Sequence, residues 1–190
     1  MKDRIICLVG PSGSGKTTVA VELEKQGYSI IHSYTDREPR SKDEWGHTFI
    51  SKEDKIDMDE VIAYVEIYGG YRYFATRSQY KDKGVSIYVV CPGGVKQVLK
   101  NVKDAEVEVI YLSADEYTRI GRLKKREGVS EWRGTDDWEL DAMDRICERI
   151  KKDKELFKTC KCDYVIDTNR RIEEVVDLVK QVIGLGGMKV

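Results

Sequence analysis

The segment Gly10–Thr17 constrains the fold of this chain more than any other part of its sequence. It reads Gly-Pro-Ser-Gly-Ser-Gly-Lys-Thr, which matches the phosphate-loop pattern G-x-x-x-x-G-K-[ST] in full. The apolar run 5–9 precedes it directly, and a helical pattern over 15–26 follows. A strand, a glycine-rich loop and a helix in this order aim backbone N–H groups and the positive helix end at one anion. The segment therefore predicts a site for the phosphates of a nucleotide.

Strand and helix patterns alternate along most of the chain. We expect strands at 4–9, 28–32, 85–90, 107–112 and 163–167, and helices at 15–26, 92–101, 114–126, 136–159 and 170–184. The first, third and fourth of these strands are almost continuously apolar, as strands buried on both faces are. With 190 residues, the pattern predicts one α/β domain in which helices cover both faces of a parallel sheet.

Two stretches interrupt this alternation. The first is 33–80, where apolar residues alternate from Val61 to Ile67 and a short capped helix is expected from Ser51. We expect it to form a small β-rich insertion. The second is 126–136, a polar stretch between two expected helices. A polar loop beside a phosphate site is the usual form of a lid.

Composition excludes several classes of protein. The formal net charge of −1 gives no electrostatic footprint for nucleic acid, and no apolar run is long enough for a membrane span. The five cysteines are odd in number and lack the spacing of a disulfide scaffold, which favours free thiols in a reducing cytoplasm. Cys160 and Cys162 have no second ligand pair nearby, so we do not expect a zinc site.

Arginines recur on both sides of the loop, and guanidinium groups bind phosphates through paired hydrogen bonds. Two such sets suit a phosphoryl-transfer site, with one for an acceptor phosphate and one for the transferring group. For Arg119, Arg145 and Arg149, pairing with acidic residues on a solvated helix face is an equally open interpretation. The two sets are Arg37 with Arg40, and Arg119, Arg122, Arg126, Arg145 and Arg149.

Three segments together resemble the guanylate kinase family of nucleoside monophosphate kinases. They are Gly10–Thr18, Ser33-Tyr-Thr-Asp-Arg-Glu-Pro-Arg40 and Tyr68-Gly-Gly-Tyr-Arg-Tyr-Phe-Ala-Thr76. Weaker similarity continues through 110–112, 122–126, Arg145 and 163–166, so the resemblance covers nearly the whole chain in order.

The resemblance implies a three-layer P-loop NTPase fold with a parallel five-stranded sheet. It divides the chain into a core (1–32, 81–121 and 146–190), a monophosphate-binding insertion (33–80) and a lid (122–145). The implied reaction is transfer of a phosphoryl group from ATP to GMP, which yields ADP and GDP. The partners would be these nucleotides alone, without nucleic acid or membrane, and the protein would be a monomer or a homodimer.

The resemblance also assigns roles to individual residues. ATP would be bound by Gly10, Ser12, Gly13, Ser14, Gly15, Lys16, Thr17 and Thr18, with Arg122 assisting and Asn169 near the adenine. The Thr17 hydroxyl would bind Mg²⁺, and Lys16, Arg126 and Arg145 would act on the transferring phosphoryl group. The acceptor nucleotide would be bound by Ser33, Arg37, Arg40, Glu66, Tyr73 and Thr76.

The sequence departs from the family pattern around the expected base pocket. Val89 and Cys91 stand where acidic residues are usual, and Ala63 aligns with a guanine-binding glutamate that Glu66 could replace. The segment 46–49 is shorter than its family counterpart and lacks a phosphate-binding tyrosine. Guanine needs acceptors for its N1–H and N2–H₂ groups. Two alternatives therefore stay open: a kinase for another small phosphorylated acceptor, such as a different nucleotide or a ribosyl phosphate, and a binding module without catalysis.

Overall fold

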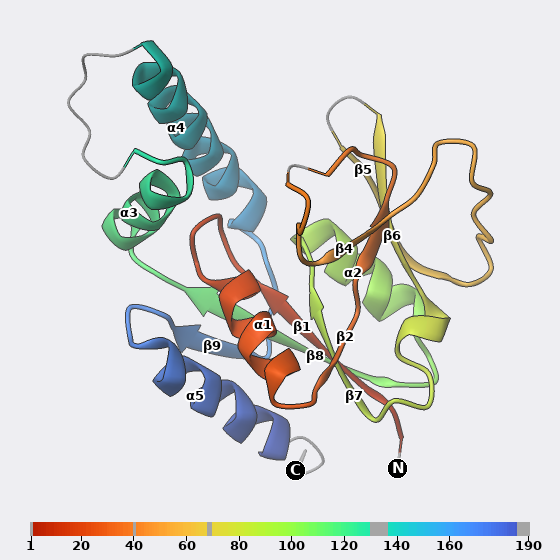
Figure 1. Cartoon of the computed structure of the whole chain (residues 1–190). Coiled ribbons are helices and arrows are strands. Elements are labelled where there is room, and N and C mark those ends of the chain that lie inside the picture. Colours follow the sequence, from red (N-terminus) through yellow and green to blue (C-terminus); the bar gives the residue numbers. More distant parts are fainter. Residues whose placement is uncertain (1, 40, 68–69, 130–136, 186–190) are drawn as a thin grey trace. The chain divides into compact units, whose positions relative to one another are not determined.

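A five-stranded sheet contains the strand that leads into the phosphate loop (Figure 1). The computed structural model describes residues 2–39, 41–67, 70–129 and 137–185. In this sheet the strand order is β2–β7–β1–β8–β9, and β1–β7, β2–β7 and β8–β9 pair in parallel. The strands are β1 (Arg4–Val9), β2 (Ser29–Ile30), β7 (Val85–Val89), β8 (Glu106–Ser113) and β9 (Tyr164–Asp167). The expected parallel α/β fold is confirmed.

The five expected helices all form, with ends close to the predicted ones. They are α1 (Lys16–Lys25), α2 (Pro92–Asn101), α3 (Glu116–Arg126), α4 (Asp137–Phe157) and α5 (Ile172–Leu185). Asp115 caps α3 by accepting the Thr118 N–H, and Pro92 occupies the first turn of α2, where its missing N–H costs nothing. In the described part of the chain, no helix has both the length and the apolarity that crossing a membrane would require.

A second sheet forms within residues 33–76, as the β-rich character of that stretch predicts. Its strand order is β4–β3–β6–β5. The strands are β3 (Ser33–Thr35), β4 (His47–Phe49), β5 (Val61–Ile67) and β6 (Tyr71–Thr76), followed by a short 3₁₀ helix, η1 (Arg77–Gln79). β6 pairs antiparallel with both β3 and β5.

Helix α2 supplies side chains to the open edge of this second sheet. The Gln97 amide accepts the Tyr64 N–H at 2.8 Å and donates to the Tyr64 carbonyl oxygen at 2.6 Å. The Asn101 amide donates to the Ile62 carbonyl oxygen at 3.2 Å. Three backbone groups of edge strand β5 are thus bonded by side chains of a helix rather than by another strand.

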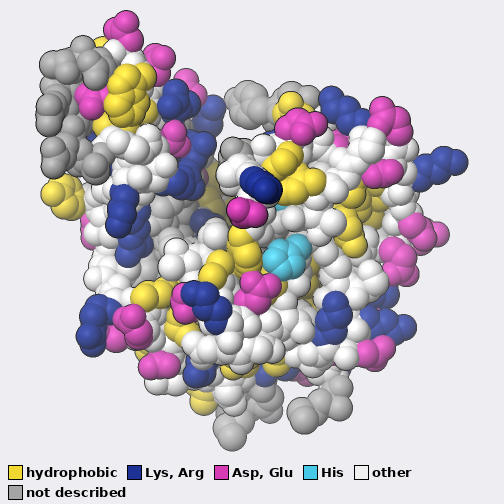
Figure 2. All heavy atoms as spheres, viewed as in Figure 1, with side chains coloured by type: hydrophobic (Ala, Val, Ile, Leu, Met, Phe, Trp, Pro, Cys, Tyr) yellow, Lys and Arg dark blue, Asp and Glu magenta, His cyan; other side chains and the backbone are white. Residues whose placement is uncertain are grey.

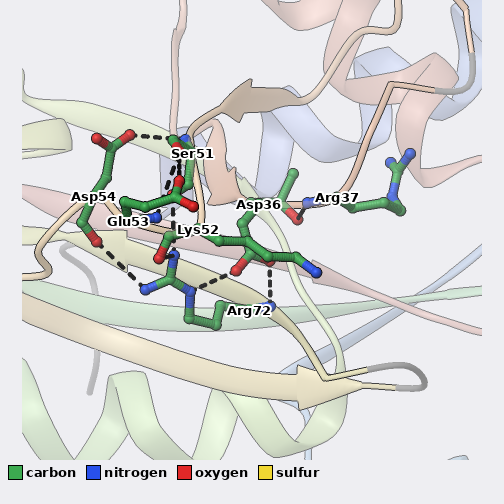
Figure 3. A network of polar contacts seen from close by, with 8 residues as sticks. Asp36, Arg37, Ser51, Lys52, Glu53, Asp54 and Arg72 are labelled. Carbon is green, nitrogen blue, oxygen red and sulfur yellow. Dashed lines mark hydrogen bonds and ion pairs between the residues drawn. The ribbon is translucent and has the colours of Figure 1, made fainter.

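The helix expected from Ser51 does not form, and that prediction is wrong. Residues 51–54 make a turn whose carbonyl oxygens bind the Arg72 guanidinium (Figure 3). The distances from Arg72 nitrogens to the carbonyl oxygens of Ser51 and Lys52 are 3.1 and 2.9 Å. Asp36 holds the guanidinium in place through an ion pair at 2.6 Å. In a helix these carbonyl oxygens would accept backbone N–H groups of the same helix. Here they accept hydrogen bonds from the Arg72 side chain, which is distant in sequence.

The chain divides into two compact units. The first contains residues up to Leu8 together with Ala20–Val109, and the second contains Val9–Val19 together with the residues from Ile110 onward. The first unit includes the second sheet and α2, and the second unit includes the phosphate loop, α3, α4 and α5. The division into core, insertion and lid expected from the sequence stays a prediction.

Candidate functional site

The phosphate loop of the second unit is folded around the Lys16 side chain. Lys16 Nζ donates to the carbonyl oxygens of Gly10 and Pro11 at 2.6 and 2.9 Å and lies 3.4 Å from Ser14 Oγ. Gly13 has φ +79°, a left-handed conformation that favours glycine, and its Cα faces the backbone of Arg119 on α3. The loop therefore curls around one ammonium group and packs directly against a neighbouring helix.

A cavity of about 650 Å³ lies over this loop. Five of its lining side chains are basic, and none of the described residues that line it is acidic. The lining consists of Ser12, Gly13, Gly15, Lys16, Thr17, Thr18, Arg122, Leu123, Lys125, Arg126 and Arg149. Figure 2 shows Lys and Arg side chains gathered over α3 and α4 on the face drawn. Such a cavity attracts a ligand with several negative charges.

A smaller cavity of about 200 Å³ adjoins the loop and shares Gly15, Thr18 and Arg122 with the first. Its other lining residues are Val19, Thr168, Arg170, Ile172 and Val175. Arg122 is fixed there because its guanidinium donates to the carbonyl oxygens of Gly13 and Thr168. Asn169, which was expected near the adenine, lies in the sequence between Thr168 and Arg170, which both line this cavity. Its side chain contacts Asp115 and Asp167.

The electrostatic setting of Lys16 favours binding of an anion. Its pKa is lowered to about 8, mainly because burial disfavours the charged form; Asp153 raises the pKa, and Arg119 and Arg126 lower it. A bound phosphate would offset both the burial and the repulsion from these arginines, since it brings an opposite charge. The loop thus carries an ammonium group that a bound phosphate would stabilise.

The structure separates the arginines of α3 and α4 into groups with different surroundings. Arg126 and Arg149 line the large cavity, whereas Arg145 is half-exposed and lies 3.5 Å from Glu127. Arg149 lies 4.0 Å from the same carboxylate. Arg119 is buried and bonds Ser12 and Asp153, so the interpretation as a solvated helix face is wrong for it.

Sequence reasoning missed Lys125 and Asp153 of this region, and it named Arg149 without giving it a role in the site. Lys125 and Arg149 line the large cavity, and Asp153 accepts a hydrogen bond from the backbone of the phosphate loop. Arg149 and Asp153 stand four residues apart and therefore share one face of α4. That spacing was the available signal, but it does not reveal which way the face points.

The first unit contains a separate cavity of about 180 Å³. It is lined by Ser33, His47, Ala63, Val65, Tyr73, Tyr88, Val89, Val90 and Cys91, two of which, Ser33 and Tyr73, were predicted to bind the acceptor. Its lining is mainly apolar, and none of the described residues that line it carries a carboxylate. Burial raises the pKa of Tyr88, so its hydroxyl stays protonated and able to donate a hydrogen bond.

Arg37 joins this cavity through Tyr73. Its Nε donates to the Tyr73 hydroxyl at 2.7 Å, and its two terminal nitrogens lie 3.2 and 2.8 Å from the Glu44 carboxylate. The Glu44 carboxylate therefore occupies the guanidinium edge that a phosphate would use. A phosphate that bound Arg37 in the same way would have to displace Glu44.

The remaining acceptor residues do not line this cavity. Glu66 is exposed, and strand alternation places it on the opposite face of β5 from Ala63 and Val65. The Thr76 N–H donates to the Gln79 side chain at 3.0 Å, which caps η1. Arg40 lies outside the described residues.

Comparisons with known proteins agree with the parallel α/β fold. The AAA domain family matches residues 6–151. A guanylate kinase from Thermotoga maritima is 25% identical over 194 aligned positions, which cover 96% of this chain and 87% of that protein. The crystal structure of guanylate kinase from Anaplasma phagocytophilum superposes with a TM-score of 0.68 at 20% identity, covering 100% of this chain and 88% of that one. The chain belongs to the AAA domain family, and in fold and motifs it resembles guanylate kinases.

Proposed function

We propose that this chain is an ATP-dependent kinase that phosphorylates a nucleoside monophosphate. The observation that carries the proposal is the large cavity of the second unit, where five basic side chains and the phosphate loop converge without an acidic residue among the described lining. Phosphoryl transfer depends mainly on positioning and on neutralising negative charge, and this is the chemistry that such a lining serves.

The residues of the loop fit ATP with Mg²⁺. The Lys16 ammonium, which contacts three neutral oxygen atoms of its own loop, would bind the β- and γ-phosphates. Mg²⁺ would be held by the Thr17 hydroxyl and phosphate oxygens, where it neutralises charge on the triphosphate. No group of three or more His, Cys, Asp or Glu side chains suited to a metal occurs in the described ranges, which fits a metal that arrives with its nucleotide.

The arginines of α3 and α4 would stabilise the transferring group. Arg126 and Arg149 line the cavity and would neutralise charge that spreads over the γ-phosphoryl oxygens. Arg145, expected to do so from the sequence, stays a candidate for the same role after release from Glu127. No general base is needed, because the attacking oxygen of an acceptor phosphate is already ionised.

We propose GMP as the first acceptor to test. Support comes from the 25% identical relative, which is named a guanylate kinase. Ser33 and Tyr73, which line the cavity of the first unit, and Arg37, which donates to the Tyr73 hydroxyl, also support it. A second candidate is a monophosphate without guanine. The mainly apolar lining favours it, because guanine N1–H and N2–H₂ would find no carboxylate among the described lining residues.

A coupled assay of ADP release with GMP, AMP, UMP, CMP and dTMP tests the proposal. We expect turnover with at least one monophosphate and complete loss in Lys16→Ala. Lys25→Ala is the matched control, because Lys25 ends the same helix, is exposed and forms an ion pair with Glu22 on the same helix surface. Its activity should equal that of the unmodified protein.

Two results would contradict the proposal in different ways. Absence of turnover with every monophosphate, together with tight calorimetric binding of ATP and Mg²⁺, would leave an ATP-binding protein that is not this kinase. Absence of ATP binding as well would favour a binding module without catalysis, the alternative from another functional class.

A further inference from the structure

Ser12 in the phosphate loop is held by side chains from two helices of the second unit. The Asp153 carboxylate on α4 accepts the Ser12 backbone N–H at 2.7 Å and lies 3.4 Å from its hydroxyl. The Arg119 guanidinium on α3 donates to the Ser12 carbonyl oxygen at 2.9 Å and to Asp153, also at 2.9 Å. Both backbone polar groups of one loop residue therefore bind the two members of one ion pair.

This ion pair is buried, so its hydrogen bonds must compensate for lost contacts with water. The exposed fractions of the Arg119 and Asp153 side chains are 8% and 11%. Charges removed from water are tolerated when an opposite charge and further hydrogen bonds compensate them. Here the further hydrogen bonds come from Ser12, so the loop is part of the compensation. Movement of the loop away from α3 and α4 would leave the pair incompletely bonded.

A second arginine extends this contact along the loop. Arg122, three residues after Arg119 on α3, donates to the Gly13 carbonyl oxygen at 3.1 Å. The carbonyl oxygens of Ser12 and Gly13 thus both point toward α3. Across a trans peptide the carbonyl and the following N–H point in opposite directions, so the Gly13 N–H turns away from α3. The direction of loop dipoles that meet a phosphate is set by these contacts.

We propose that Asp153 is a positioning residue for the donor nucleotide: with Arg119 it holds the Ser12 peptide so that the phosphate loop keeps the shape that receives a triphosphate. The inference rests on the proposed ATP site and goes beyond it, because it makes a residue of α4 control donor affinity without touching the nucleotide. Asp153 lies 141 positions from Ser12 in the sequence, and nothing in the loop motif points to it.

Asp153→Asn tests the inference, because it preserves size and removes the charge. Asp141→Asn is the matched control, since Asp141 is an exposed acid on the same helix. Calorimetry well below each variant's unfolding midpoint gives the dissociation constants of Mg²⁺–ATP and of inorganic tripolyphosphate. We expect both constants to rise by about tenfold in Asp153→Asn, as for a lost hydrogen bond to a charged group, and to stay unchanged in Asp141→Asn.

Steady-state kinetics separate positioning from a general structural role. The KM for ATP should rise while the KM for the acceptor stays unchanged, and Asp153→Glu should recover part of the ATP affinity. A folded Asp153→Asn variant whose ATP and tripolyphosphate affinities lie within about twofold of the unmodified protein would overturn the inference.

A second variant covers the case in which Asp153→Asn does not fold. Arg119→Lys keeps the charge beside Asp153 but lacks the planar fork that reaches both Ser12 and Asp153. The same selective loss of ATP affinity is expected, and unchanged affinity would overturn the inference here too. Failure of the unmodified protein to bind ATP would instead refute the proposed function, so the two failures are distinguishable.

Discussion

Replacing Gly13 with alanine tests how closely the phosphate loop depends on α3. A Cβ at Gly13 would lie 2.7 Å from the Arg119 carbonyl oxygen and 3.1 and 3.2 Å from the Arg119 Cα and carbonyl carbon. All three atoms belong to the backbone of a helix, so they cannot turn aside as the end of a side chain could. The residue also has φ +79°, a conformation that side chains with a Cβ disfavour.

The expected loss of stability has two parts. The left-handed conformation costs an alanine about 1–2 kcal/mol. Forcing a methyl group into backbone contact costs a further ~1–3 kcal/mol, the range for overpacked sites. We therefore expect Gly13→Ala to lower the free energy of unfolding by about 2–5 kcal/mol.

Gly128→Ala is the matched control. Gly128 follows α3 in the same unit with φ +81°, and its Cβ would meet no atom within 4 Å. Only the conformational cost of about 1–2 kcal/mol applies there. Urea unfolding followed by circular dichroism measures both values, and equal slopes against urea confirm that the same unfolding is compared. Equal destabilisation of the two variants would refute the reasoning, because the predicted difference comes entirely from the contact with α3.

Further predictions concern charge and specificity. Burial alone would raise the pKa of Asp36, but hydrogen bonds from the Arg72 N–H and guanidinium lower it below 3.8. The ionised Asp36 therefore contributes stability that is fully present above about pH 4 and is lost as pH falls through its lowered pKa. We expect Asp36→Asn to be less stable than the unmodified protein at neutral pH. Its stability, followed by fluorescence, should also fall less between neutral and acidic pH. Arg149→Ala should lower kcat by about a hundredfold, and Arg145→Ala should lower it much less. A larger loss of kcat in Arg145→Ala, measured by rapid-quench assays, would instead indicate that Arg145 binds the phosphoryl oxygens. Cys91→Asp keeps a good N-cap for α2 and adds a carboxylate to the cavity of the first unit. The ratio of kcat/KM for GMP to kcat/KM for UMP should therefore rise by about tenfold. An unchanged ratio would show that this cavity does not recognise the base.

Features set by neighbouring residues were predictable from the sequence. The strand at 4–9 and the loop at 10–17 follow from a continuous apolar run and from spacing within eight residues, and the structure has both. The helix from 92 to 101 was predicted with both ends correct, because Pro92 fixes its first turn. Both predictions rest on spacing within a short segment and on the fixed φ of a proline, which do not depend on contacts with distant residues.

Features that depend on distant contacts were not predictable. The turn after Ser51 carries a helix-start signal, but Arg72 takes its carbonyl groups. Arg145 and Arg149 share one helix face by spacing, and only the rotation of α4 decides that Arg149 lines the cavity. Glu66 was a candidate for base recognition, yet the register of β5 turns it away from the cavity. In each case the deciding contact joins segments that no local pattern connects.

The Gln97 amide on α2 has a consequence for how copies of this chain meet. By taking both the N–H and the carbonyl of Tyr64, it fills hydrogen-bonding positions that an incoming strand would use on β5. A substitution such as Gln97→Leu would leave those positions open while adding an apolar side chain beside them. We therefore expect Gln97→Leu to aggregate more readily than the unmodified protein on heating.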